Sequence, residues 1–323
     1  MRNRLRSTAA LLPPLALLAL LLLMPAEASR GARSGLSVCA GVIVPSLFPF
    51  LLLSSMLSAL ALPEALASLA EPLFRRLGLP AIAAAPFLLG LCGGYPVGAA
   101  AVAELVSSGA IAPEDGSRML PYCNHTGPGF IMGVAGAAVF GSMRVGLLLY
   151  LSHVLAALTL ALLTGRRAGP AALRPALPDR PLAEVFPACI RSAAEAVLLI
   201  CAYVVFFSML TAILQSVGLF SVLAAILSVR FGAELRFCTA LLSGWMELGS
   251  GIAALRGAAA SPANLALAAF LLGFGGLSVH AQTLTAVSGT NIKCARHFAG
   301  RILHGFLSAA YILLYCLLRR PQI

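Results

Sequence analysis

Charged side chains are scarce in this chain: only 10% of its 323 residues are Asp, Glu, Lys or Arg. A soluble domain carries about 25% of such residues, whereas 60% of the residues here are hydrophobic. This composition excludes an ordinary soluble protein and predicts a polytopic membrane protein, all-α, with no stretch polar enough for a separate soluble domain.

Acidic residues and paired cysteines are also lacking. The chain has 11 acidic residues against 22 Lys and Arg, a net charge of +11. The positive residues are mostly arginines in short clusters between apolar runs, so the positive-inside rule explains them and nucleic-acid binding is not expected. The eight cysteines contain no C-x-x-C pair, which indicates neither a zinc site nor a disulfide framework.

The apolar runs divide the chain into four parts. Residues 1–35 are an N-terminal transmembrane helix and a short loop, 36–164 a first repeat, 165–191 a cytoplasmic linker rich in Arg and Pro, and 192–323 a second repeat. Pro25-Ala26-Glu27-Ala28 fits a signal-peptide cleavage site, so a cleaved leader is the alternative to the uncleaved helix that we prefer. Short amphipathic helices are expected over residues 63–79 and 219–236.

Glycine and proline interrupt four of the apolar segments. The interrupted stretches are Gly90–Ala99, Asn124–Phe130, Ser243–Gly251 and Gly273–Thr283. Backbone groups freed inside a bilayer must find protein, water or a ligand, and transporters build their sites from such discontinuous helices or re-entrant hairpins. The alternative is that small residues simply let the helices pack closely.

The interruptions follow the same order in both halves. Gly94 corresponds to Gly244 at an offset of 150 (244 − 94), and His153 to His304 at an offset of 151 (304 − 153). Such internal repeats predict a binding site where the two halves meet near the midplane. If the hairpins re-enter, the repeats are inverted; if they cross the membrane, the repeats are parallel.

Glu247 is the one acidic residue deep in a predicted membrane segment without a basic residue at helical spacing. A carboxylate there costs roughly 2.5 kcal/mol or more to insert, which makes it a functional candidate by default. It can bind a proton or a cation, or accept hydrogen bonds from a substrate. The alternative is an internal hydrogen bond to Ser243, Ser250 or the broken backbone.

Polar residues also gather at two of the interruptions. Ser278, His280 and Gln282 point to one side if the segment is extended, whereas Ser278 and Gln282 share a face if it is helical. Asn124 and Thr126 occupy the corresponding place in the first half, beside His125, and can cap the half-helix that follows, whose N–H groups attract anions.

The combined motifs resemble the YlbJ (SpoVV) family of sporulation integral membrane proteins, which is grouped with the nucleoside-recognition (Gate) domain proteins. The matching motifs are Phe48-Pro49-Phe50, Gly94-Tyr95-Pro96-Val97-Gly98-Ala99, Asn124 with Gly127-Pro128 and Phe130, Glu247 with Gly251, and Gly275–Gln282. The resemblance covers about residues 36–318. It implies a fold similar to concentrative nucleoside transporters, and a role in moving dipicolinate (pyridine-2,6-dicarboxylate) across a membrane of the sporulating bacterial cell.

Departures from the family pattern occur at the first hairpin and the second interruption. Ala100 and Ala101 stand where a polar residue is usual, Thr126 where Ser is common, and Gly129 where a larger apolar residue is common. The alanines indicate that this hairpin contacts substrate through its backbone. The candidate substrate-binding residues are Gly94, Tyr95, Gly98, Asn124, Thr126, Gly127, Glu247, Ser278, His280 and Gln282.

Three functions are compatible with these features: a transporter of a small polar or anionic metabolite, a transporter of nucleosides or other heterocycles, and a sporulation membrane scaffold that transports nothing. Four chain breaks favour transport, since a scaffold has no use for them. An enzyme is not expected, because Ser278 and His280 lack a third catalytic partner or metal-ligand pattern. The expected partners are the substrate, the lipid bilayer and a coupling proton or Na⁺; no cofactor and no oligomeric state are predicted.

Overall fold

All the regular secondary structure in the part that the structure describes is helical. The computed structural model describes residues 2–59, 71–165 and 181–319, and none of these residues is in a strand. The expected amphipathic helix over residues 63–79 is therefore described only from Glu71, with residues 71–76 helical. Most arginines of the predicted linker fall on residues 166–180, outside the described part.

Four helices are long and apolar enough to cross a membrane, namely Met143–Thr164, Ala183–Ser216, Pro262–Ala286 and Ala295–Leu318. Leu11–Leu23 and Pro25–Gly41 add a fifth span if this pair, bent by 101°, crosses as one unit. The predicted all-α membrane class is confirmed at this level: the chain is a multi-pass integral membrane protein.

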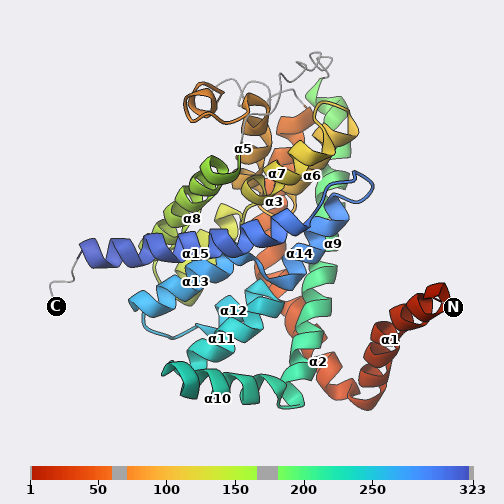
Figure 1. The fold of residues 1–323 in the computed structure, drawn as a ribbon, viewed down its shortest axis with the longest axis vertical. Helices are drawn as coiled ribbons and strands as arrows, with labels where there is room; N and C mark the ends of the chain where they lie inside the picture. Colours follow the sequence, from red (N-terminus) through yellow and green to blue (C-terminus); the bar gives the residue numbers. More distant parts are fainter. Residues whose placement is uncertain (1, 60–70, 166–180, 320–323) are drawn as a thin grey trace.

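The N-terminal region differs from the sequence prediction. Helix α1 (Arg2–Leu23) projects from the bundle, as Figure 1 shows, and the expected short loop is instead helix α2 (Pro25–Val38). Gly31 and Gly35 let α2 lie directly against helix α9, because a Cβ on Gly31 would come within 2.7 Å of the Met209 Cα. This Gly-x-x-x-Gly spacing favours close packing of membrane helices. A π-helical turn (η1, Cys39–Ile43) leads into α3 (Val44–Ala59).

The first pair of broken helices follows. Its elements are η2 (Ala81–Ala83), α5 (Ala84–Gly93), α6 (Val97–Ser107), α7 (Pro113–Cys123), the π-helix η3 (Gly129–Val139) and α8 (Met143–Thr164). Between α5 and α6 the chain turns at Gly94, with φ of 75°, and at a cis Tyr95–Pro96 peptide. Between α7 and η3 it is irregular over residues 124–127.

The remaining elements are α9 (Leu182–Ser216), α10 (Leu219–Phe231), α11 (Leu235–Met246), α12 (Leu248–Ala254), α13 (Pro262–Phe274), α14 (Gly276–Ala286) and α15 (Ala295–Leu318). The interruptions lie at Glu247 and at Gly275. Since α9 begins at Leu182, the predicted linker ends about ten residues earlier than expected. Helix α10 is not amphipathic: Val222, Ile226 and Val229 are all exposed, and its one charged residue is in the last turn.

Two apolar cores hold the broken helices in place. The first lies between α5, α6, α7 and α8, with Phe87, Leu120 and Leu160 buried in it. The second lies between η3, α8, α12, α13 and α15, around Ile131 and Ile312. Figure 1 shows α15 running across the molecule between α8 and α13. Lipid tails are as apolar as leucine, so these cores contribute mainly through close packing.

Candidate functional site

All four helix interruptions face one cavity. Tyr95 comes from the α5–α6 break, Thr126 and Gly127 from the α7–η3 break, Glu247 from the α11–α12 break, and Ser278, with Gln282, from the helix that follows Gly275. Apolar side chains of η1, α3, η3, α9, α12 and α14 complete the lining. The cavity has a volume of about 60 Å³, which is room for about two water molecules. A larger solute requires the helices to separate.

The Glu247 carboxylate caps helix α12 from inside this cavity. Its Oε1 accepts from the Gly249 N–H at 2.8 Å and its Oε2 from the Ser250 N–H at 2.5 Å. The side chain is buried, and within the described residues it forms no ion pair. Glu247 therefore makes the hydrogen bonds to the broken backbone that were considered as an alternative from the sequence. It also lies in the wall of the cavity.

Arg301 lies behind the cavity and is fully buried. Its guanidinium donates to the Asn124 carbonyl at 2.8 Å, to the Leu272 carbonyl at 3.4 Å, to His304 Nδ1 at 2.7 Å and to the Tyr95 hydroxyl. Its carbon Cζ also lies 5.2 Å from the centre of the Tyr95 ring. In the described part of the chain no carboxylate pairs with it, so its positive charge is solvated by neutral groups alone.

Tyr95 connects this cation to the cavity, because its ring lines the cavity and its hydroxyl contacts Arg301. The Arg301 Nε atom is buried and has no hydrogen-bond partner within the described residues. A buried unsatisfied donor costs about 1–3 kcal/mol, more when it is charged. The Arg301 guanidinium is therefore an uncompensated positive charge that is separated from the cavity by Tyr95.

The prediction that Asn124 and Thr126 cap the half-helix that follows them, η3, is wrong. No side chain caps η3, because Asn124 and Thr126 bond to other helices instead. Asn124 Nδ2 donates to Thr283 Oγ1 at 2.8 Å, and Thr126 Oγ1 donates to the Leu272 carbonyl at 2.7 Å. These two residues connect the second interruption, between α7 and η3, to α13 and α14. Thr126 lines the cavity, whereas Asn124 lies outside its wall.

The segment after Gly275 takes the helical alternative. Ser278 and Gln282 share a face of α14 and both line the cavity. His280 does not line the cavity. Its ring centre lies 4.9 Å from that of Phe274, 4.3 Å from that of Phe298 and 5.3 Å from that of His297. His280 is thus packed among rings, outside the cavity.

Gly94 and Gly98 also lie outside the cavity lining and permit close contact between the two first-half breaks. A Cβ on Gly94 would come within 2.8 Å of the Gly127 backbone nitrogen, and a Cβ on Gly98 would overlap the Cys123 carbonyl oxygen. These two glycines therefore allow close packing of the helices, which is the alternative considered from the sequence.

Replacing Gly94 with Ala is expected to lower the thermal unfolding midpoint in detergent more than Gly109→Ala does. Both glycines have positive φ, 75° and 71°, a sparsely populated range that costs an L-residue about 1–3 kcal/mol. Only Gly94 adds a clash, because nothing lies within 4 Å of a Cβ on Gly109. Equal shifts in the two variants would mean that the Gly94–Gly127 contact contributes nothing.

Sequence reasoning missed Arg301, although a signal for it exists. His297, Arg301, His304 and Ser308 are spaced i, i+4, i+7 and i+11, and all four are buried on one face of α15. Arg301 lies in the second turn of α15, close to Lys293 and Arg296, where a positive residue also fits a charge that flanks a membrane span. A polar stripe at helical spacing inside a hydrophobic helix indicates a face turned toward the bundle interior.

Three histidines have ligand atoms close enough to hold a metal ion: His125, His153 and His304, within 4.8 Å of one another. Two of them are already engaged. His304 accepts from Arg301 at Nδ1 and donates from Nε2 to the His153 carbonyl at 3.0 Å, while His153 Nε2 accepts from the Thr126 N–H at 3.3 Å. The adjacent guanidinium also repels a cation, so the cluster fits a hydrogen-bonded core better than a metal site.

The whole chain was compared with known proteins. The sporulation integral membrane protein YlbJ of Bacillus subtilis (strain 168) is 27% identical over 317 residues, covering 90% of this chain and 78% of that protein. The chain is therefore similar to this YlbJ protein along most of its length. No protein-family model and no solved structure matches it. The match covers 90% of this chain, so it includes the residues that line the cavity, which lie between Ile43 and Gln282.

Proposed function

We propose that this chain is a member of the YlbJ family and transports a small anionic metabolite, dipicolinate by that resemblance, through the cavity where its broken helices meet. The observation that carries the proposal is the convergence of all four interruptions on one cavity with polar side chains. Interrupted helices around a central site are the usual construction of secondary transporters. A purely structural membrane protein has no need of buried polar groups at such a place.

The charge of the site favours an anion over a nucleoside. Arg301 is fully buried without a carboxylate partner in the described residues, and charged residues within membrane segments mark substrate and ion pathways. A dicarboxylate supplies the missing negative charge, whereas a neutral nucleoside leaves the positive charge of Arg301 uncompensated. Tyr95 contacts Arg301 and lines the cavity, so its side chain would lie between the guanidinium and the bound dicarboxylate.

The order of elements supports two repeated halves as part of the same proposal. Helices α5–α6, α7–η3 and α8 are followed later by α11–α12, α13–α14 and α15, a second hairpin, broken helix and long span. His153 and His304, which correspond in the two halves, contact each other with ring centres 4.4 Å apart. Repeats that meet at the site allow alternating access by movement of one against the other.

Uptake by purified full-length protein in vesicles tests the proposal. We expect saturable accumulation of labelled dipicolinate above that of protein-free vesicles, and no competition from a panel of nucleosides. Uptake of a nucleoside without dipicolinate would establish the heterocycle alternative. If neither is taken up by correctly folded protein, the scaffold alternative replaces transport.

A further inference from the structure

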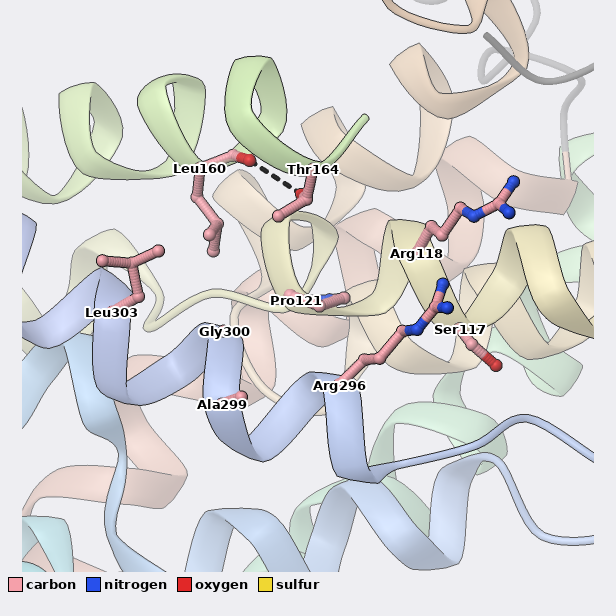
Figure 2. A pocket seen from close by; sticks show the side chains of 9 residues that line it. All are labelled: Ser117, Arg118, Pro121, Leu160, Thr164, Arg296, Ala299, Gly300 and Leu303. Atoms are coloured by element: carbon pink, nitrogen blue, oxygen red, sulfur yellow. Dashed lines mark hydrogen bonds between the residues drawn. The ribbon is translucent and has the colours of Figure 1, made fainter. Parts of the chain in front are cut away.

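A second and larger cavity lies apart from the transport site, between helices α7, α8 and α15 (Figure 2). Its volume is about 430 Å³, within the range of small-molecule sites. One end carries the cationic side chains of Arg118 and Arg296, and the other the apolar side chains of Leu160 and Leu303. The two ends therefore suit different parts of one amphiphilic ligand.

The two arginines are the groups available at the polar end. Arg296 is exposed and has no hydrogen-bond acceptor within the described chain. Arg118 Nη1 bonds Asp115 at 3.1 Å, but this pair is partly exposed and such pairs contribute little. Since guanidinium has five donors, most remain free. The hydroxyls are occupied: Ser117 Oγ accepts from the Lys293 N–H, and Thr164 Oγ1 donates to the Leu160 carbonyl.

The apolar end is shaped by close helix packing. A Cβ on Gly300 would come within 2.5 Å of the Pro121 Cβ, so glycine is what allows α15 to lie this close to α7. Leu303 is 38% exposed beside it. Figure 2 shows Leu160 and Leu303 at the end of the cavity away from the two guanidinium groups. An alkyl chain placed there would contact mainly the apolar side chains of Leu160, Leu303 and Pro121.

We propose that this cavity binds one anionic phospholipid, with its phosphate between Arg118 and Arg296 and its glycerol and upper acyl chains along Leu160 and Leu303. Basic pockets between transmembrane helices on the cytoplasmic side bind anionic head groups. Thr164, which lines the cavity, ends α8 immediately before the arginine-rich stretch that the positive-inside rule assigns to the cytoplasm. A soluble phosphate would use the arginines but not the apolar end.

Native mass spectrometry of the delipidated full chain tests this with phosphatidylglycerol and phosphatidylcholine of identical acyl chains. We expect wild-type protein to prefer phosphatidylglycerol, and Arg118→Gln/Arg296→Gln to bind it about 30-fold more weakly, from the contribution of two arginines near the membrane surface. Arg230→Gln, an exposed arginine on α10 outside the cavity, is the matched control and should keep the preference.

Three results would overturn the assignment. These are equal binding of the two lipids by wild type, unchanged phosphatidylglycerol binding by the double variant, and displacement of the lipid by inorganic phosphate at equal concentration, which would mark a free-anion site. If the double variant unfolds, Arg296→Gln alone decides, since it removes no native hydrogen bond, and it should weaken binding about fivefold.

Discussion

Arg301→Gln is expected to reduce the preference for dipicolinate over the neutral pyridine-2,6-dicarboxamide by about 100-fold, measured as a ratio of dissociation constants. Two unit charges about 7 Å apart, with one side chain between them, interact by about 2.4 kcal/mol at an effective dielectric constant of about 20, and each 1.4 kcal/mol is a factor of ten. Arg301 is the buried cation next to the cavity, joined to it through Tyr95. Its removal should therefore weaken binding of the dianion far more than binding of the diamide.

The ratio separates charge recognition from damage to the fold. Arg301 bonds the Asn124 and Leu272 carbonyls and His304, so any substitution leaves buried acceptors unsatisfied. Such damage affects both ligands equally and cancels in the ratio. Arg301→Lys keeps the charge and loses the planar fork, so it should retain most of the preference. An unchanged ratio in folded Arg301→Gln protein would remove Arg301 from substrate recognition.

Glu247→Gln is expected to slow dipicolinate uptake at least tenfold and to abolish its response to an imposed pH gradient. The carboxylate accepts two backbone N–H groups of α12, one with each oxygen. Gln has a single acceptor oxygen, so one buried N–H loses its partner, at about 1–3 kcal/mol. The amide also cannot carry a proton, which is the role that we expect for an intramembrane carboxylate beside an anionic substrate.

The matched control is Glu234→Gln. Glu234 is the residue at the N-cap of α11, as Glu247 is at that of α12, but its side chain makes no capping hydrogen bond and is exposed. This variant should behave as wild type. If Glu247→Gln transports slowly but still responds to the pH gradient, Glu247 acts as a cap and not as a proton site.

The helix interruptions could be predicted because their causes are local. Gly94 requires positive φ and Gly275 ends α13 in the left-handed conformation, and glycine adopts both readily. The positions of Tyr95, Glu247 and Gln282 in the cavity follow from those breaks. The all-helical membrane class followed from composition, which depends on no detail of packing.

The rest depends on contacts between distant parts of the chain. Asn124 bonds Thr283, 159 residues away, and Thr126 bonds Leu272, 146 residues away, so neither is free to cap η3 as its local sequence suggested. The hydrogen bonds of buried Arg301 likewise depend on the α5–α6 break, the α7–η3 break and helix α13, which supply Tyr95, Asn124 and Leu272 as its acceptors. Local propensity is a weak guide where tertiary contacts compete for the same polar groups.

The most direct test of a solute cavity at the helix breaks is substrate protection of a cysteine placed in its wall. Ser278 lines the cavity, and its hydroxyl has no partner in the described residues, so Ser278→Cys should preserve the packing. In vesicles, a small water-soluble thiol reagent should inactivate Ser278→Cys faster than the wild-type chain with its eight native cysteines, and dipicolinate should slow that reaction. Inactivation at the wild-type rate, or a rate that dipicolinate leaves unchanged, would contradict the cavity as the path of the substrate.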